Sequence, residues 1–389
     1  MRVEELERRL PLAGNVTAEM VGSTLRLSGD NLANDVMVAS AAGGRIAVVG
    51  IDTTINGKTT AFVTNGAVTS IIANFRGGDD AVGFDNSAAD YASQRQFTAL
   101  ATTPETWFED PAAPFDVMAV QAMIDGVVGG VATFTIPGSL RVMTGAGNDS
   151  VGIAGEIGGR VVVRLGPADT GNGILIGSES TPSHIGGGVL VIGAAANDLA
   201  VIGNASVAET VSAVLGDGEN WMLVAAASTT PAAIGTLAYA GGNGGDTVTL
   251  IGDVTIREDA CIGTGARGAD EVGFYQSDAG DTVKVLGDVA VTTGAGSDQV
   301  SIFAATVGRM VRIDTGVGDD AVQIDALEVR GDLVIRLGAG DDSLGVKNLR
   351  AATVFLDGGI GTNSLTMDAA TQIGARTLKH RRFQVVTPG

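Results

Sequence analysis

Residues 331–346 read GDLVIRLGAGDDSLGV, an alternating apolar strand, a glycine-rich turn and a second alternating strand. Leu333, Ile335 and Leu337 recur at every second position, which is the pattern of a strand with one buried face. The turn glycines permit positive φ angles and close approach between backbones. Imperfect copies of this unit fill most of the chain.

The residue that opens the outgoing strand recurs at a nearly constant step. Its positions are Asp246, Asp270, Asp298, Asp320, Asp342 and Asn363, with steps of 24, 28, 22, 22 and 21 residues. A step near 22 is one full coil of a three-faced parallel β-helix, so we expect an all-β solenoid of this kind. Roughly a dozen coils at ~4.8 Å each would give a rod of about 55–60 Å. Each coil exposes strand edges until a neighbour stacks on it, so the array must be contiguous and capped.

The repeat pattern divides the chain into five parts. They are a lead-in at 1–15, N-terminal coils at 16–84 (one of them at 43–50), an insertion at 85–136, the main array at 137–375, and a closing strand and tail at 376–389. The insertion holds a large share of the aromatic residues. Within it, residues 111–128 have an apolar spacing compatible with one helix. The closing strand carries a basic face.

Charge and composition exclude several classes of protein. The formal net charge of −20 argues against nucleic acid or an anionic membrane surface as a partner. No apolar run approaches the roughly 20 residues of a membrane helix, so we expect no membrane span. Cys261 is alone, which excludes an intrachain disulfide, and His184 and His380 are expected at the surface. No catalytic constellation emerges, and we expect a protein that is not an enzyme.

The turn acids have two interpretations. In the first, each Asp accepts hydrogen bonds from nearby backbone N–H groups and needs no ligand. In the second, the stacked carboxylates of Asp298, Asp320 and Asp342, with Asp319 and Asp341 beside them, bind Ca²⁺. Calcium suits such an edge because it takes several carboxylate and carbonyl oxygens in a flexible shell.

The units GGNGGDTVTL, GVGDDAVQI and GAGDDSLGV resemble the GGxGxDxUx calcium-binding repeats of RTX-type secreted proteins. The resemblance covers mainly residues 241–346, with further copies at 77–84 and 145–153. Each coil has one such unit rather than two in tandem, and the middle turns GPADTGN, GAAAND and GDGEN lack it. The resemblance implies calcium ligands at seven carboxylates. They are Asp246, Asp270, Asp298, Asp319, Asp320, Asp341 and Asp342.

A second resemblance lies near the N-terminus. The segment LERRLPLAGNVTA is similar to the LEPR-XLL lead-in of large exported planctomycete proteins, which precedes β-rich repeats in many of them. Leu6, Glu7, Arg9 and Leu12 match that motif, while Arg8 stands in place of its proline. The resemblance implies an extracellular or cell-surface location, although no conventional signal peptide is visible.

Three functions remain open from the sequence. The first, which we favour, is a non-catalytic surface or matrix rod, stabilised by calcium, with surface polysaccharide or matrix components as partners. The second is a carbohydrate-active β-helix, a polysaccharide lyase or hydrolase, whose insertion walls a groove with Tyr91, Glu105, Trp107, Glu109 and Asp110. The alternative for those aromatics is a small satellite core over the coils. The third is an adhesin that uses a flat β face.

Overall fold

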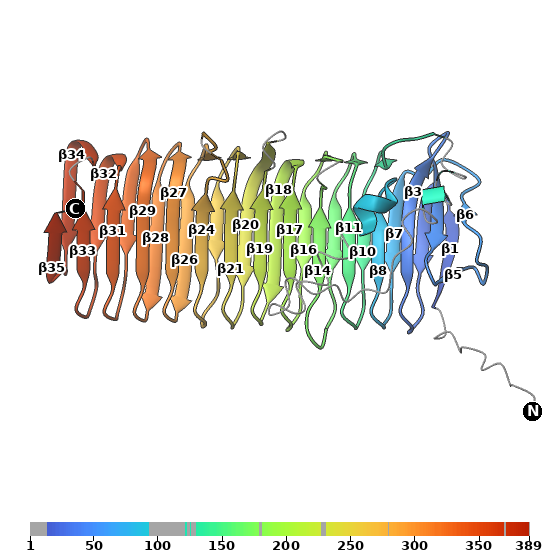
Figure 1. Ribbon diagram of the computed structural model, residues 1–389, viewed down its shortest axis with the longest axis horizontal. Coiled ribbons are helices and arrows are strands. Elements are labelled where there is room, and N and C mark those ends of the chain that lie inside the picture. The colour runs from blue at the N-terminus through green and yellow to red at the C-terminus, as the bar shows by residue number, and fades with distance from the viewer. Residues whose placement is uncertain are drawn as a thin grey trace, which may run out of the picture.

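Parallel coils stacked along one axis make up nearly the whole molecule (Figure 1). This computed structural model describes residues 14–92, 121–122, 125, 130–178, 181–226, 231–278, 280–368 and 371–388. The chain is 57% strand and 2% helix, and its β-solenoid has about 10 turns spaced about 23 residues apart. The expected fold class is therefore confirmed. None of the helical segments in the described residues has the length and hydropathy of a membrane span.

Three faces form each coil, as the 22-residue spacing predicted. The first face stacks the strands that enter the glycine-rich turn: β2 (Thr24–Ser28), β7 (Ser70–Asn74), β10 (Leu140–Met143), β13 (Val161–Arg164), β16 (Val189–Ile192), β18 (Ala205–Gly216), β20 (Ala232–Gly241), β23 (Ala260–Gly263), β26 (Val289–Ala295), β28 (Val311–Val317), β30 (Asp332–Arg336), β32 (Arg350–Asp357) and β34 (Gln372–Arg381).

The second face stacks the strands that leave the turn, and the third face is shorter. The second face contains β3 (Asp35–Ala41), β8 (Ala81–Phe84), β11 (Ser150–Ile153), β14 (Gly173–Ile176), β17 (Leu199–Gly203), β19 (Trp221–Ala225), β21 (Thr247–Ile251), β24 (Glu271–Tyr275), β27 (Gln299–Val307), β29 (Ala321–Val329), β31 (Ser343–Lys347), β33 (Ser364–Met367) and β35 (Val385–Pro388). The third contains β9 (Thr135–Ile136), β12 (Glu156–Ile157), β15 (Ser183–Ile185), β22 (Val254–Ile256), β25 (Val283–Val285) and one end each of β18, β20, β27, β29, β32 and β34.

One apolar core runs through the inside of the coils, from Val16 to Leu365. In the coil of residues 331–346, Leu333, Ile335 and Leu337 are fully buried, whereas Val334 and Arg336 are partly exposed on the outer side. This confirms the inward and outward positions that the alternation predicted. Burial of each such aliphatic side chain is worth roughly 1.5–3 kcal/mol relative to exposure.

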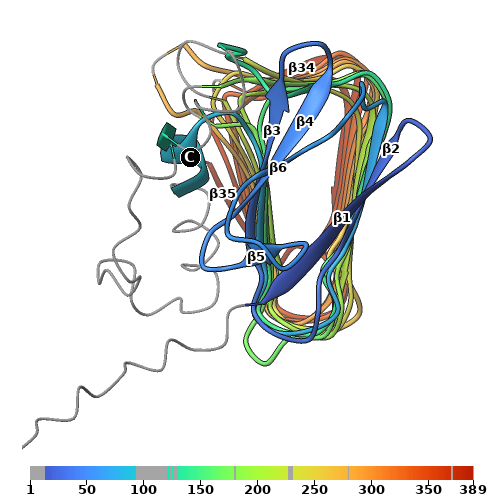
Figure 2. The ribbon, with the colours of Figure 1, turned by 90° about the vertical axis from the view of Figure 1, so that its right-hand side faces the viewer.

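The N-terminal end differs from the expected coils. Strand β1 (Asn15–Val21) pairs antiparallel with β2, β4 (Arg45–Gly50) pairs antiparallel with β3, and β6 (Phe62–Val63) pairs antiparallel with β4. The prediction of a coil at 43–50 was wrong, because Gly43 and Gly44, at φ of 77° and 70°, reverse the chain into a hairpin. Figure 2 shows these strands and β5 (Thr54–Ile55) lying across the N-terminal end of the solenoid. They cover edges that a plain coil would leave unpaired.

The insertion leaves the stack between two coils that pair directly with each other. Strand β7 pairs in parallel with β10 and β8 with β11, while the chain returns through β9, which pairs with β12. At the root, the rings of Phe84 and Phe134 lie 5.9 Å apart between centroids. Helical residues occur at 88–92 and at 121, 122 and 125. The remainder of the helix expected over 111–128 lies outside the described residues.

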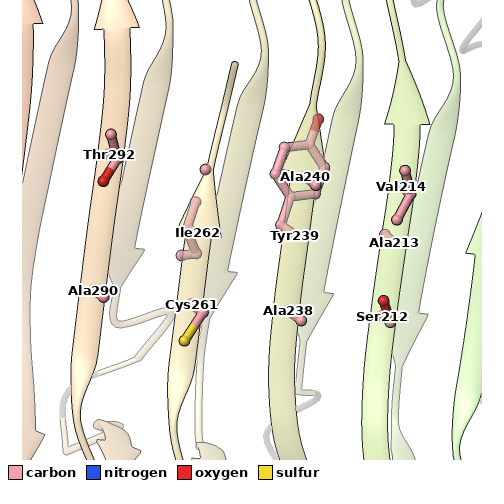
Figure 3. Close-up of a pocket in the computed structure, with 11 residues that line it drawn as sticks. Ser212, Ala213, Val214, Ala238, Tyr239, Ala240, Cys261, Ile262, Ala290 and Thr292 are labelled. Atoms are coloured by element: carbon pink, nitrogen blue, oxygen red, sulfur yellow. The ribbon is translucent and has the colours of Figure 1, made fainter. Parts of the chain in front are cut away.

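The outer side of the first face carries a shallow depression of about 280 Å³ across β18, β20, β23 and β26 (Figure 3). Its floor is a row of small side chains in register, Ser212, Ala238, Cys261 and Ala290. Cys261 is exposed there. Small side chains form this surface, and none of the described residues that line the depression is a carboxylate or a histidine.

Candidate functional site

An Asn or Asp directly precedes every second-face strand except β35, and its side chain is buried in the solenoid. After the first member, Asn34, its side-chain oxygen accepts a hydrogen bond from the backbone N–H of the equivalent residue one coil earlier. The N–H of Asp298 donates to Oδ1 of Asp320 at 2.9 Å, and the N–H of Asp320 donates to Oδ1 of Asp342 at 3.0 Å. Each bond thus ties a turn to the backbone of its neighbour.

We call this column the inner Asx ladder. All its members are between 0 and 2% exposed. In chain order they are Asn34, Asp80, Asp149, Asn172, Asp198, Asn220, Asp246, Asp270, Asp298, Asp320, Asp342 and Asn363. The last acceptor is Oε1 of Gln384, to which the N–H of Asn363 donates at 2.6 Å.

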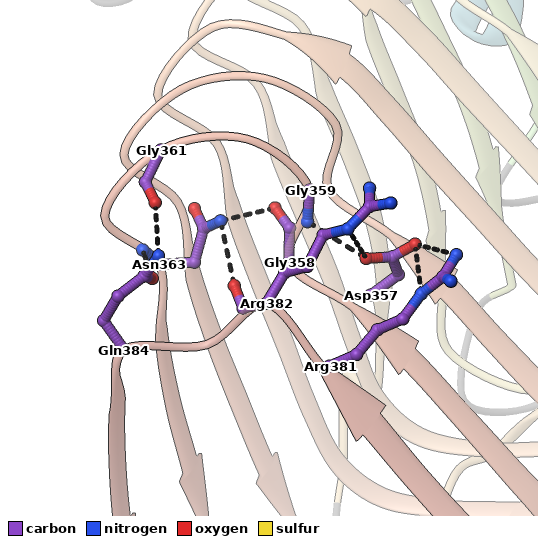
Figure 4. Close-up of polar contacts among 8 residues, drawn as sticks. All are labelled: Asp357, Gly358, Gly359, Gly361, Asn363, Arg381, Arg382 and Gln384. Carbon is purple, nitrogen blue, oxygen red and sulfur yellow. Dashed lines mark hydrogen bonds and ion pairs between the residues drawn. The ribbon is translucent and has the colours of Figure 1, made fainter.

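The Asn members of the inner Asx ladder use their second side-chain atom as a donor. Nδ2 of Asn172 donates to the carbonyl of Gly166 at 3.0 Å, and Nδ2 of Asn363 donates to the carbonyl of Gly358 at 2.7 Å. Figure 4 shows the second of these contacts in the last turn. The side-chain amide of such an Asn therefore forms hydrogen bonds both with the neighbouring coil and with its own turn.

The Asp members have a second acceptor instead of a donor. Oδ2 of Asp298 accepts from the hydroxyl of Thr293 at 2.6 Å, and Oδ2 of Asp270 accepts from Thr264 at 2.5 Å. In five others Oδ2 is buried without a hydrogen-bond partner among the described residues. These are Asp80, Asp149, Asp246, Asp320 and Asp342.

Burial makes these carboxyls harder to ionise. Loss of solvent raises the pKa of Asp80 to about 7 and that of Asp198, Asp246 and Asp320 to about 6, against an ordinary value of 3.8. For Asp320, the charges of the neighbouring carboxylates in the ladder act in the same direction, while its hydrogen bonds oppose them. The pKa of Asp149 is also raised by burial.

A second, exposed row lies beside the ladder, and its hydrogen bonds run in the opposite direction. The N–H of Asp341 donates to Oδ1 of Asp319 at 2.8 Å, and the N–H of Thr362 donates to Oδ1 of Asp341 at 2.6 Å. The N–H of Asn148 donates to Oδ1 of Asp79 in the same way. All seven carboxylates proposed as calcium ligands therefore already accept a backbone hydrogen bond from an adjacent coil.

Calcium binding at these carboxylates stays a prediction. A calcium site needs six to eight oxygens that converge on one point. Within the described ranges, no group of three or more His, Cys, Asp or Glu side chains is placed to hold a metal ion. Five of the seven residues face the interior in a single column, and the other two face solvent. The arrangement instead matches the first interpretation, a turn whose acids satisfy the backbone.

An ion pair between a buried carboxylate and exposed arginines fastens the last coil (Figure 4). Nη2 and Nε of Arg381 lie 2.6 and 2.9 Å from Oδ2 of Asp357, and Nε of Arg382 lies 3.7 Å from Oδ1. The carboxylate side chain is 6% exposed. The guanidinium of Arg381 also lies 5.3 Å from the centre of the Phe355 ring. The basic face predicted for the closing strand thus has a defined acidic partner.

The insertion residues proposed to bind sugar are only partly described. Tyr91 is 1% exposed, and its hydroxyl donates to Asp35 at 2.5 Å. It belongs to a satellite cluster outside the main core, as the structural alternative predicted. The cluster comprises Met37, Ala39, Val49, Ala88 and Tyr91. Glu105, Trp107, Glu109 and Asp110 lie outside the described residues.

The glycine motif alone does not identify four ladder positions. Asn34, Asn172, Asp198 and Asn220 occupy the ladder in turns that lack the GxGxD pattern. The signal that identifies them is an Asn or Asp directly before an apolar strand, one coil from the next such residue. Comparisons with protein-family models, curated proteins and solved structures gave no significant match.

Proposed function

We propose that the chain is a non-catalytic structural rod of an extracellular or cell-surface assembly. The observation that carries this proposal is the inner Asx ladder, which continues from the first coil to the last. It uses the turn side chains to join one coil to the next. In a stacked array each coil contacts only its neighbours, so such bonds stiffen every step.

Two features support the location and the partners. The N-terminal segment resembles the lead-in of exported planctomycete repeat proteins. The net charge of −20 favours solubility in salty media and interaction with basic partners. Surface polysaccharide or matrix components are the proposed neighbours of the rod. Specific calcium stabilisation is not part of this proposal, because the seven candidate carboxylates already accept backbone hydrogen bonds.

Removal of whole coils tests the role as a rod. Deleting residues 287–330 takes out two coils of 22 residues and joins Leu286 to Gly331 in register. We expect a folded, monodisperse particle whose maximum dimension in small-angle scattering is shorter by about 10 Å. A compact particle of unchanged length would contradict the proposed rod. So would the absence of a β-sheet signal from both the full chain and the deletion variant.

An activity screen separates this proposal from a carbohydrate-active enzyme. The full chain is incubated with acidic and neutral polysaccharides, and reducing ends and unsaturated products are measured. We expect no product above the level of heat-denatured protein. Turnover that is lost in Glu105→Gln or Asp110→Asn would replace the structural function with a catalytic one.

A further inference from the structure

Strand β8, the last strand before the insertion, lies between two buried carboxyls. Asp80 precedes it and Asp85 follows it, and they are 2% and 1% exposed. Oδ1 of Asp80 accepts from the N–H of Asn34 at 2.8 Å, and Oδ1 of Asp85 accepts from the N–H of Ser87 at 3.0 Å. Oδ2 of each is buried without a hydrogen-bond partner among the described residues.

This strand joins the N-terminal coils to the main array. It pairs with β3 on one side and with β11 on the other. Across the second boundary, the N–H of Asp80 donates to Oδ1 of Asp149 at 2.9 Å, a contact between residues 69 positions apart in sequence. Oδ2 of Asp149 is likewise buried without a hydrogen-bond partner among the described residues. Asp80 and Asp149 therefore adjoin at the start of β8, and Asp85 lies at its other end, where the insertion leaves the stack.

The ionisable groups that face these carboxyls are themselves acids. Asp80 faces Asp149 in the next coil and Asp30 in the turn before β3. Asp149 faces Asp79, and Asp85 faces Asp90 in the helical residues 88–92. Ionisation of one of these carboxyls therefore makes ionisation of its acidic neighbour less favourable. The polar partner of Asp80 is Asn34, whose Oδ1 is another buried acceptor with no partner in the described part of the chain. A proton on Asp80 would therefore supply a donor where donors are lacking.

We propose that β8 is a pH-sensitive switch, held firmly in the stack when Asp80 and Asp85 are uncharged and loosened when both are ionised. The switch controls how tightly the root of the insertion and the N-terminal coils attach to the main array. It goes beyond the proposed structural role and holds whether or not the rod is catalytic.

The direction of the pH dependence follows from burial. Burial raises the pKa of Asp80 and of Asp85 to about 7, although hydrogen bonds to Asn34 and Ser87 partly offset it. An unfolded Asp titrates at about 3.9. Between these two values the folded strand binds more protons than the open one, so its stability falls as pH rises and reaches its lower level above about pH 7.

Amide hydrogen exchange of the full chain measures the switch directly. Protection of the β8 amides is compared at about pH 6 and about pH 8, corrected for intrinsic exchange, with β13 as the reference strand. A carboxyl with this shift should lower β8 protection by about tenfold across that interval, and two by about a hundredfold. A salt concentration of about 1 M NaCl screens the surface charges, so that general repulsion does not imitate the effect.

Substitutions assign the effect to its residues. We expect D80N/D85N to abolish the loss of β8 protection, since Asn already fills the ladder at Asn34 and Asn172. D79N removes an exposed neighbouring carboxylate and should leave the loss intact. Equal protection of β8 at both pH values in the wild-type chain, or an undiminished loss in D80N/D85N, overturns the proposal. If D80N/D85N does not fold, ¹³Cγ-Asp labelling of the wild-type chain decides: two carboxyls titrating near pH 7 support the switch, and none above about pH 5 overturns it.

Discussion

The backbone N–H of Asp320 donates to Oδ1 of Asp342, one coil later, at 3.0 Å. The same relationship recurs from Asn34 to Asn363, so the turn acids belong to the framework of the solenoid. Leaving a buried N–H without an acceptor costs more free energy than a typical hydrogen bond contributes, so the fold should be sensitive to truncation of the ladder side chains.

Truncation of one ladder carboxylate should show this cost. We expect Asp320→Ala to lower the free energy of unfolding by about 1–3 kcal/mol relative to Asp320→Asn, because the N–H of Asp298 loses its acceptor inside the protein. Denaturant unfolding measures the difference. Asp319→Ala is the matched control, since water can replace its exposed oxygen. An equal loss in both alanine variants would count against the ladder.

Two glycines of the same coil should differ in how strongly a substitution by alanine destabilises the protein. Gly340 has φ +149°, and a Cβ there would lie 2.0 Å from the carbonyl oxygen of Gly318, so Gly340→Ala should cost roughly 2–4 kcal/mol. A Cβ on Gly345 meets nothing within 4 Å, and Gly345→Ala should change stability by no more than about 1 kcal/mol. Similar thermal shifts for the two variants would contradict the coil-to-coil packing of the turns.

The ion pair of the last coil should matter more than an exposed one. Asp357→Asn leaves Arg381 without its buried partner, and we expect a loss of about 1–2 kcal/mol together with faster amide exchange in β34. Asp253→Asn breaks the exposed pair with Lys284 and should cost about 0–1 kcal/mol. Unchanged exchange in β34 would show that Asp357 does not fasten the closing coil.

The melting temperature of the protein in calcium should equal its melting temperature in magnesium at the same ionic strength. A specific site occupied at a hundredfold excess over its Kd would stabilise the fold by about 2.7 kcal/mol, which differential scanning calorimetry resolves. The seven candidate carboxylates are engaged with backbone amides, so we expect no such gain. A calcium-specific rise that EDTA reverses would restore the RTX-like interpretation.

The repeat period and the alternation of residues such as Leu333 and Ile335 were sufficient to predict the coil, its three faces and its core. The direction in which a turn acid points was not predictable, because the same GxGxD pattern suits either a metal shell or a backbone acceptor. The hairpin at 43–50 also escaped prediction, since apolar alternation does not distinguish an antiparallel partner from a parallel coil. Asn172 and Asn220 were missed because the motif emphasises glycines, whereas the ladder needs only a side-chain oxygen at the start of the strand.

A crystal structure of the chain grown in calcium would show whether the ladder carboxylates bind the backbone or a cation. We expect Oδ1 of Asp342 to lie within hydrogen-bonding distance of the N–H of Asp320, with no cation between successive ladder carboxylates. Density for a metal ion bridging Asp320 and Asp342, with those N–H groups turned elsewhere, would contradict this expectation.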